Sequence, residues 1–307
     1  MRLKLQVEPV SAFGSELLGG TLFGQLCWAL RWQHSESYLC ELLDGYLEGR
    51  PFAVVSDAFP SGYLPLPTLP SFLWQKPDDV DRKELKARQW INAQVCRNEP
   101  LSKWQSFALK TSDLSDAQRL YTVEVKNSIN RLTGTTGEKA FSPYMSERIW
   151  YNRGAKLDIY VDLDGRLDPE TLIRALNRVG EMGFGADAST GMGKFQINHY
   201  EEIPQEPESS SWVTLASCNP TDRDYDLKKS FYRIKTHFGR HGSELAVCEN
   251  PFKKPILLAQ RAAVFSIPLV EKRQFIGRGI SDISLSQPTS VHQGYSPVIA
   301  LTLNYEG

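Results

Sequence analysis

The chain has 307 residues, enough for two ordinary domains that each bury a hydrophobic core. Hydrophobic residues make up 41% and charged residues 23% of it, which is typical of a globular protein, and no apolar run is long enough to cross a bilayer. The formal net charge of −1 excludes a general electrostatic attraction to nucleic acid, so RNA binding would require a local basic surface.

Cysteine usage and the amino terminus indicate the compartment. The five cysteines form an odd set without a CxxC pair, which is typical of reduced thiols. Residues 1–7 alternate like a strand and lack the apolar core of a signal peptide. We therefore expect a cytoplasmic protein with no membrane partner.

The first part of the chain predicts a strand, two helices and a second strand. Apolar residues alternate over 2–10, as in a half-buried strand. Thr21 can cap a helix whose apolar residues recur at helical spacing to about residue 32. A second helix is expected over 37–46, and the β-branched segment 52–56 predicts a short strand.

A long insertion is expected next, at about 60–153. The proline-rich segment 59–70 predicts a rigid extended loop rather than a helix or a central strand. Residues 77–110 predict one or two short helices, including one over 81–97. An arm at about 123–150 predicts a long hairpin with a polar, basic tip, and long insertions of this kind are usually functional arms or disordered.

A strand, a helix and a strand follow the insertion. Residues 156–163 alternate as a strand, and Asp168 caps an amphipathic helix with Pro169 at its first position, which the fixed φ of proline favours. A glycine-rich loop, 183–195, then leads into a strand over 194–200. The order β-α-β, insertion, β-α-β indicates a ferredoxin-like arrangement.

The predicted fold class is therefore α+β, with two ferredoxin-like (RRM-like) domains. The first spans 1–203, and the polar, proline-bearing residues 204–211 predict a linker. The second domain, 212–307, is expected to be a degenerate, strand-rich copy of the first, because its helix signals are weak. Its predicted strands lie at 212–217, 232–236, 256–260, 263–268 and 298–304.

The glycine-rich loop is the most informative motif. Its glycines are Gly183, Gly185, Gly191 and Gly193, and Lys194 follows them. Glycine permits φ > 0 and a close approach to main-chain N–H groups, and consecutive N–H groups can form a nest for an anion such as phosphate. The order helix, loop, strand does not fit a P-loop or a dinucleotide fingerprint. We expect contact with a phosphate backbone and no nucleotide cofactor, with a simple chain reversal as the alternative.

Basic and aromatic residues are interleaved in two further regions. Arg131 and Lys139 flank the tip of the arm, and Arg233, His237 and Arg240 alternate along or just beyond one predicted strand. Cations combined with aromatic rings are typical of proteins that bind single-stranded RNA, where stacking contributes roughly 1–3 kcal/mol per base. Each residue alone could be ordinary surface or core, but together with the glycine loop they favour RNA binding. The interleaved aromatics are Tyr144, Trp150, Tyr151, Phe231, Tyr232 and Phe238.

Catalytic and metal chemistry have little support in the sequence. His237 and His241 have i,i+4 spacing and could combine with Cys218 and Cys248, but the paired CxxC that makes zinc motifs specific is missing. Either histidine could act as a general acid–base in a ribonuclease, although lone histidines more often contact phosphate or pack at a surface. We expect no metal, no catalytic residue and no enzyme activity.

Five ordered stretches resemble one known family. Residues 20–30 (GTLFGQLCWAL) and 183–195 (GFGADASTGMGKF) are similar to the first-helix and glycine-loop signatures of the RAMP superfamily of CRISPR proteins. Residues 56–65 (SDAFPSGYLP), 253–258 (KKPILL), and Gly277-Arg-Gly with His292-Gln-Gly-Tyr295 are similar to the 5′-tag-capping subunit of type III-A (Csm) effector complexes. The resemblance spans nearly the whole chain.

The resemblance implies a role in antiviral defence. Family members have two ferredoxin-like domains, hold the repeat-derived 5′ tag of the guide RNA, and contact a large polymerase-like subunit and a backbone RAMP subunit without cleaving RNA. Carried over by position, the glycine loop would hold the tag, and the 123–150 arm would kink the RNA through Asn130, Arg131 and Thr135. Arg233, His237, Arg240 and Tyr295 are further candidates in the second domain.

Three alternatives stay open from the sequence. The first is a RAMP endoribonuclease that processes repeat RNA through His237 or His241. The second is the equivalent subunit of a Cmr-type complex. The third is an enzyme that binds a small nucleotide, which the departures from the nucleotide motifs disfavour.

Overall fold

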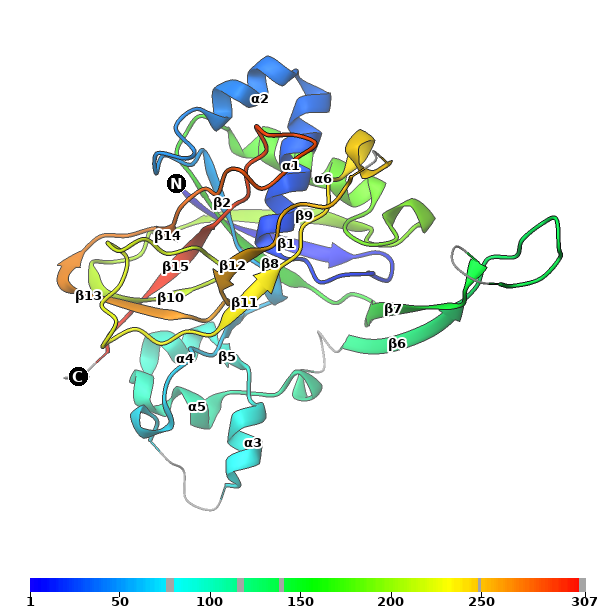
Figure 1. Ribbon diagram of the computed structural model, residues 1–307. Coiled ribbons are helices and arrows are strands. Elements are labelled where there is room, and N and C mark those ends of the chain that lie inside the picture. The colour runs from blue at the N-terminus through cyan, green and yellow to red at the C-terminus, as the bar shows by residue number, and fades with distance from the viewer. Residues whose placement is uncertain (76–79, 115–118, 138–140, 248–249, 304–307) are drawn as a thin grey trace.

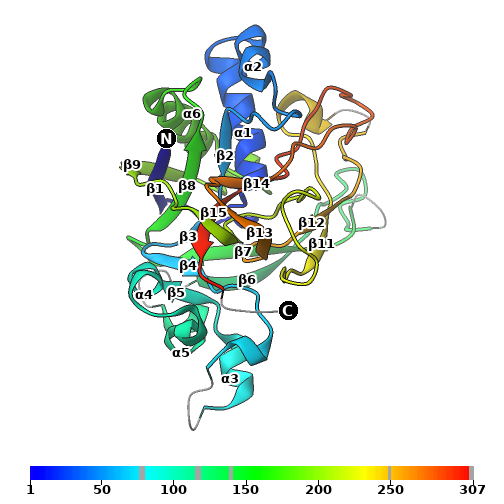
Figure 2. The ribbon, with the colours of Figure 1, turned by 90° about the vertical axis from the view of Figure 1, so that its left-hand side faces the viewer.

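The computed structural model describes residues 1–75, 80–114, 119–137, 141–247 and 250–303. Two antiparallel sheets lie near its centre (Figure 1). Figure 2 shows that three helices gather at one end of the molecule, opposite the insertion: α1 (Gly19–Gln33), α2 (Glu36–Leu43) and α6 (Pro169–Met182). Within the described ranges, no helix combines the length and apolar character needed to cross a membrane.

The first sheet has the strand order of a ferredoxin-like fold. Its main strands are β1 (Arg2–Pro9), β2 (Ala53–Val55), β8 (Leu157–Leu163) and β9 (Phe195–Ile203). All neighbours are antiparallel in the order β2-β8-β1-β9, so the unit's fourth strand lies beside its first, with α1 and α6 as the crossovers. A short strand, β3 (Phe59–Pro60), also pairs with β8. The predicted order of elements is confirmed.

The two crossover helices begin differently. At α6 the Asp168 carboxylate accepts the Thr171 N–H, as predicted, and Pro169 occupies the first turn. At α1 the predicted cap is wrong, because Thr21 lies inside the helix. The Asp57 carboxylate, from the loop after β2, accepts the Gly19 N–H instead at 2.8 Å. A carboxylate distant in sequence thus replaces the local cap.

The insertion contains more regular structure than its sequence indicates. Two strands, β4 (Tyr63–Pro65) and β5 (Trp90–Asn92), pair with each other, so the proline-rich segment is not purely a loop. The predicted helix over 81–97 is interrupted by β5, because Trp90 and Ile91 are buried in a second hydrophobic core. The helices around it are α3 (Arg82–Ala87), α4 (Ala93–Asn98) and α5 (Trp104–Phe107).

The arm is a two-stranded hairpin, as predicted. Strands β6 (Arg119–Lys126) and β7 (Tyr144–Tyr151) pair along their whole length, with Lys126 opposite Tyr144 at the outer end. Figure 1 shows the hairpin and its tip extending away from the rest of the molecule.

The second sheet is strand-rich but does not have the ferredoxin-like order. Its strands are β10 (Ser209–Thr214), β13 (Val264–Glu271), β14 (Phe275–Gly277) and β15 (Tyr295–Leu301), in the order β13-β10-β15-β14. Two further strands, β11 (Ile234–His237) and β12 (Ile256–Ala259), form a separate ladder. In the described part of 204–303 there is a 3-10 turn but no α-helix. Each of the five predicted strands overlaps an observed one, but β14 was not predicted. A second ferredoxin-like order is not found, because loops replace its helices.

Residues 204–211 are fixed rather than free. Glu206 pairs with Arg2 at 3.0 Å and accepts the Ala300 N–H at 2.9 Å, and β10 already begins at Ser209. The side chain of Gln293 bonds both the N–H and the C=O of Val55 in β2. The second half of the chain is therefore joined to the first by buried hydrogen bonds.

Candidate nucleic-acid interface

The four loop glycines have positive φ, and three of them are needed for packing. A Cβ atom at Gly183, Gly185 or Gly193 would collide with the Met192 carbonyl, the Ser15 hydroxyl or the Phe184 backbone, respectively. Gly191 differs, because a Cβ atom there would meet open space. Packing of a compact turn after α6 is therefore sufficient to explain three of the four glycines, whether or not the loop binds a ligand.

Main-chain N–H groups at both ends of this loop already have partners. Phe184 donates to the Gly193 carbonyl at 2.9 Å, Gly193 donates to the Ala12 carbonyl at 2.7 Å, and Lys194 donates to the Ser11 hydroxyl at 2.9 Å. The predicted nest of consecutive free N–H groups is therefore wrong for these residues. The Lys194 side chain is exposed, so its contact with a phosphate stays a prediction, as does that of Gly191.

The outer part of the β6–β7 ladder, next to the tip of the arm, lies against the glycine loop. Asp187, which has φ 59°, accepts the Ser146 hydroxyl at 3.0 Å and lies 3.7 Å from the Lys126 ammonium group. The structure thus brings together two of the predicted elements, the loop and the arm, that are separated by the strand β8 and the helix α6 in the chain. A strand of RNA that contacts one of them would lie close to the other.

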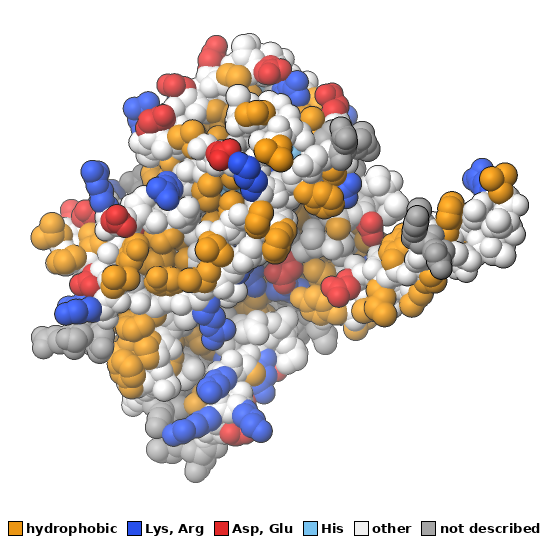
Figure 3. All heavy atoms as spheres, viewed as in Figure 1, with side chains coloured by type: hydrophobic (Ala, Val, Ile, Leu, Met, Phe, Trp, Pro, Cys, Tyr) orange, Lys and Arg blue, Asp and Glu red, His pale blue; other side chains and the backbone are white. Residues whose placement is uncertain are grey.

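The predicted residues at the arm's tip differ in availability. Asn130 pairs with Thr135 across the turn and its side-chain oxygen accepts the Leu132 N–H at 2.9 Å, so its amide shapes the tip. Arg131 is exposed and can reach a ligand. Lys139, the remaining candidate, lies outside the described residues. Figure 3 shows apolar side chains along this arm and basic side chains scattered over the viewed face, with several at the bottom over the insertion.

Candidates in the second half have three different environments. Arg233 is exposed just before β11, and Arg240 is exposed with its guanidinium 5.7 Å from the Phe252 ring centroid. Tyr295 is fully buried, and its hydroxyl donates to the Tyr46 carbonyl at 2.5 Å. Its prediction as an RNA contact is wrong, because the ring packs in the hydrophobic core.

The histidines do not form the zinc site considered from the sequence. His241 is buried and its Nε2 lies 2.6 Å from the Ser284 hydroxyl, while Cys218 is buried in a separate core cluster. Among the described residues, no group of three histidine, cysteine or acidic side chains could hold a metal ion. Cys248 lies outside those residues.

His237 instead faces a second histidine that the site prediction left out. The His237 and His292 rings lie 4.9 Å apart at 34°, beside the first turn of α1. We call this place the histidine cleft. Its lining residues are Leu18, Gly20, Thr21, Asp57, Ser217, Lys235, His237, Leu258 and His292. Nothing in the sequence pattern connects His292 with His237, because the contact forms only when the loop before β15 folds against β11.

Electrostatics in this cleft keep both imidazoles neutral. Burial, together with the neighbouring His237 and the lysines Lys253 and Lys235, lowers the pKa of His292 to about 3. Burial, Lys235 and Lys253 also lower the pKa of His237. Basic side chains thus outnumber acidic ones in the cleft.

A charge network links the cleft to the arm. Glu16 pairs with Arg119 of β6 at 2.9 Å and with Arg261 at 3.5 Å, and Arg261 pairs with Asp57 at 3.3 Å. Burial alone would raise the pKa of Glu16, but the two arginines outweigh it and hold this pKa below its usual value. These side chains neutralise one another and hold the arm's base to the body.

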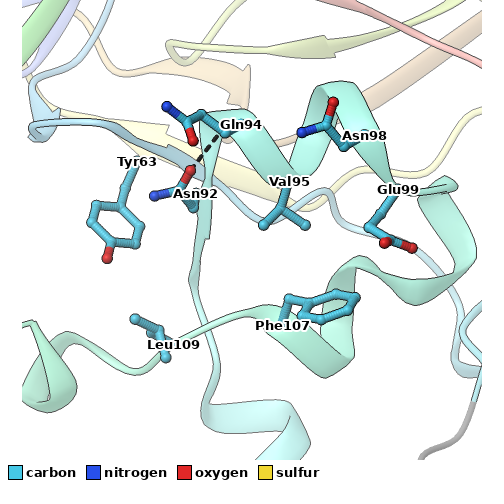
Figure 4. Close-up of a pocket in the computed structure, with 8 residues that line it drawn as sticks. All are labelled: Tyr63, Asn92, Gln94, Val95, Asn98, Glu99, Phe107 and Leu109. Carbon is cyan, nitrogen blue, oxygen red and sulfur yellow. Dashed lines mark hydrogen bonds between the residues drawn. The ribbon is translucent and has the colours of Figure 1, made fainter.

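A larger hollow, of about 490 Å³, lies in the insertion (Figure 4). Val95 and Phe107 point toward each other across it, with Tyr63 and Leu109 at one side. Its lining contains three amides and one carboxylate, Glu99, but no lysine or arginine. This composition does not suit a phosphate backbone, so the hollow is not part of the candidate interface.

Comparison with known proteins places the fold. No family model and no curated protein sequence matches the chain. Among solved structures, a chain in the Csm1–Csm4 cassette bound to cA4 matches with a TM-score of 0.60 and 18% identity, covering 100% of both chains. A chain in the Csm3–Csm4 subcomplex of the type III-A CRISPR–Cas interference complex matches with a TM-score of 0.59 and 13% identity, covering 98% of this chain and 99% of that one.

The chain shares its fold with a chain in each of these two Csm structures. Csm4 is the component that the two structures share, and the likeness extends over the whole chain in each. The α+β fold class predicted from the sequence is thereby confirmed. At identities of 13–18%, the likeness concerns the course of the backbone and does not extend to individual side chains.

Proposed function

We propose that the protein is the Csm4-type subunit of a type III-A CRISPR effector complex and holds the 5′ tag of the guide RNA. The observation that carries this proposal is the likeness in fold over the full chain to structures that both contain Csm4. Csm4 is accompanied by Csm1 in one and by Csm3 in the other. This supports the partners that the family resemblance implies, the large polymerase-like subunit and a backbone RAMP subunit.

The local geometry supports RNA contact at the loop and arm. The exposed Lys194 follows the glycine loop, the outer part of the arm's strands bonds to that loop through Asp187, and Arg131 is exposed at the arm's tip. A cation at each end of one surface can neutralise phosphates along a strand, while a net charge of −1 leaves acidic surface for protein neighbours.

The protein acts, in this proposal, without catalysing a reaction or using a cofactor. His241, one of the two candidate general bases, is buried and hydrogen-bonded to Ser284. His237 faces His292 and two lysines, and within the described residues it has no hydrogen bond to a carboxylate that would orient it as a base. The endoribonuclease alternative predicts specific cleavage of repeat RNA that is lost in His237→Ala, and incubation of purified protein with that RNA separates the two functions.

The deciding experiment is co-purification with the Csm subunits encoded beside it, followed by sequencing of the bound RNA. We expect short guides with a common 5′ tag. The double variant Gly191→Asp, Lys194→Glu should lower guide-RNA recovery several-fold, because it puts two negative groups where the backbone would lie.

The matched control is Lys86→Glu, an exposed lysine on α3 in the insertion. It changes the charge by as much as Lys194→Glu does but lies outside the loop and arm. Equal RNA recovery with the wild type, the double variant and the control would show that the loop is not part of the interface. A complex without guide RNA would overturn the proposed function itself.

A further inference from the structure

The histidine cleft collects basic groups from separate parts of the chain. Lys235 and His237 lie on the same side of β11, and His292 comes from the loop before β15. The stem of Lys253 is adjacent, since a Cβ atom at Gly239 would be 3.1 Å from its Cδ and 3.6 Å from the Nε2 of His237. Four potentially cationic side chains therefore converge beside the start of α1.

Acidic groups do not balance this cluster. Lys235 and Lys253 are both partly buried, and neither has a carboxylate within 4.0 Å in the described part of the chain. Asp57 is the one carboxylate lining the cleft, and it already accepts the Gly19 N–H at 2.8 Å and pairs with Arg261 at 3.3 Å. Partly buried cations without partners are unfavourable unless an anion joins them.

His292 is a second, independent indication of a ligand. Its side chain is 8% exposed, lines the cleft and makes no hydrogen bond within the described residues. Its ring edge faces the helix, since a Cβ atom at Gly20 would be 3.0 Å from its Cε1 and 3.1 Å from its Nε2. A buried imidazole without a partner, next to the amino-terminal end of a 15-residue helix, favours a bound anion.

The size of the cleft limits the ligands that it can bind. The cleft has a volume of about 20 Å³, enough for roughly one water-sized group. It can admit a single oxygen of an anion whose remainder stays outside, but not a whole nucleotide. A metal ion is disfavoured by the lysines. We propose that the histidine cleft binds one phosphate oxygen of a single-stranded RNA backbone; this rests on the proposed function and adds a contact separate from the glycine loop and the arm.

The chain itself connects the two places. The Ser15 hydroxyl accepts the Ala186 N–H of the glycine loop at 3.3 Å, and Leu18 and Gly20, a few residues later, line the cleft. Segment 14–20 thus runs from the glycine loop to the histidine cleft. RNA lying across this segment would contact both.

Proton uptake accompanies binding at such a site. The groups that face the two imidazoles are Lys235, Lys253, Asp57 and, beside Lys253, Cys27, whose thiol is neutral because burial raises its pKa to about 12. A phosphate oxygen favours the charged form of a histidine, and His237, the less buried of the two, is the one that can take up a proton near neutral pH. RNA affinity of the wild type should therefore rise as pH falls from 8 to 6, and His237→Gln should reduce this dependence.

The test measures binding of a fluorescent oligouridylate to the full-length protein over a range of salt concentrations. Each phosphate contact contributes about 0.7 to the slope of log K against log salt for a single strand, so Lys235→Gln should lower the slope by about 0.7. Lys86→Gln on α3, an equal loss of charge, should leave it unchanged. Lys235 is only partly buried, so this variant complements His237→Gln if the latter folds poorly.

Each outcome decides the proposal. A lower slope in Lys235→Gln alone supports it, and equal slopes in both lysine variants overturn it while leaving the proposed function intact. Displacement of the oligonucleotide from the wild type and from Lys235→Gln equally by inorganic phosphate, at constant ionic strength, also overturns it. If the wild type binds no RNA and the purified complex contains none, the proposed function fails as well.

Discussion

Arg2 is a charged residue in an alternating strand, yet only 1% of it is exposed. Its guanidinium makes a two-bonded pair with Asp162 at 2.7 and 2.8 Å, pairs with Glu206 at 3.0 Å, and donates to the carbonyls of Val298 and Gln274. The alternation predicted the strand correctly but gave Arg2 a solvent-facing position. Its partners lie between 160 and 296 residues away in sequence, so no local pattern could reveal them.

Replacing Arg2 tests this network. Arg2→Met should reduce the free energy of unfolding by about 3–5 kcal/mol, because it leaves buried carboxylates without their counter-charge. Arg178→Met, which breaks an exposed pair with Glu181 on α6, should cost about 1 kcal/mol or less. Urea unfolding followed by circular dichroism measures both, and equal losses would contradict the central role of Arg2.

His292 gives a residue-scale prediction about pH. Its pKa in the folded protein is about 3, below the usual value near 6.5 for an unfolded chain, so between these values the unfolded state binds more protons. Stability should therefore be fully present above pH 6.5 and fall on acidification, by up to about 1.4 kcal/mol per pH unit for this one proton. The melting temperature of His292→Gln should fall less steeply on acidification than that of the wild type. The melting temperature of His199→Gln, a change at an exposed position on β9, should fall as steeply as that of the wild type.

At the scale of elements, helices and strands with strong local sequence signals could be predicted, and those with weak signals could not. Helix α6 has a cap, a first-turn proline and an apolar stripe, and it forms where predicted. Strand β5 interrupts a predicted helix because Trp90 and Ile91 gain burial against β4 and the second core. The glycine loop was located correctly, but which N–H groups are free depends on Ser11 and Ala12 far away in the chain.

The arm offers an element-scale prediction. Lys126 and Tyr144 are direct partners at the outer end of the hairpin, so a two-residue Asn-Gly turn can replace residues 127–143 without changing the register. Because the Asn130–Thr135 turn bonds within itself, the shortened protein should keep its melting temperature to within a few degrees and lose guide-RNA recovery. A large fall in melting temperature would instead mean that the tip packs on the body.

At the scale of the whole molecule, the two halves share buried contacts rather than a flexible linker. Gln293 bonds Val55 twice, at 2.8 and 2.7 Å, and Tyr295 packs on Tyr46 with ring centroids 5.2 Å apart. Polar composition over 204–211 indicated a linker, because composition does not reveal that Glu206 faces Arg2. The predicted boundary between two domains stays a prediction, but the contacts across it couple the halves energetically.

This coupling predicts one cooperative unfolding transition. Gln293→Ala leaves the N–H and C=O of Val55 buried without their side-chain partner, which should cost about 1–3 kcal/mol for each group left unsatisfied. If the halves are coupled, that loss should appear equally in tryptophan fluorescence from Trp90 in the insertion and from Trp212 in β10, each isolated in a variant that retains only that tryptophan. Gln287→Ala, in an exposed loop where the side-chain amide bonds Thr289, should shift neither signal. Separate transitions for the two tryptophans would show that the halves unfold independently. The contacts of Gln293 and Arg2 would then orient the halves without coupling their stability.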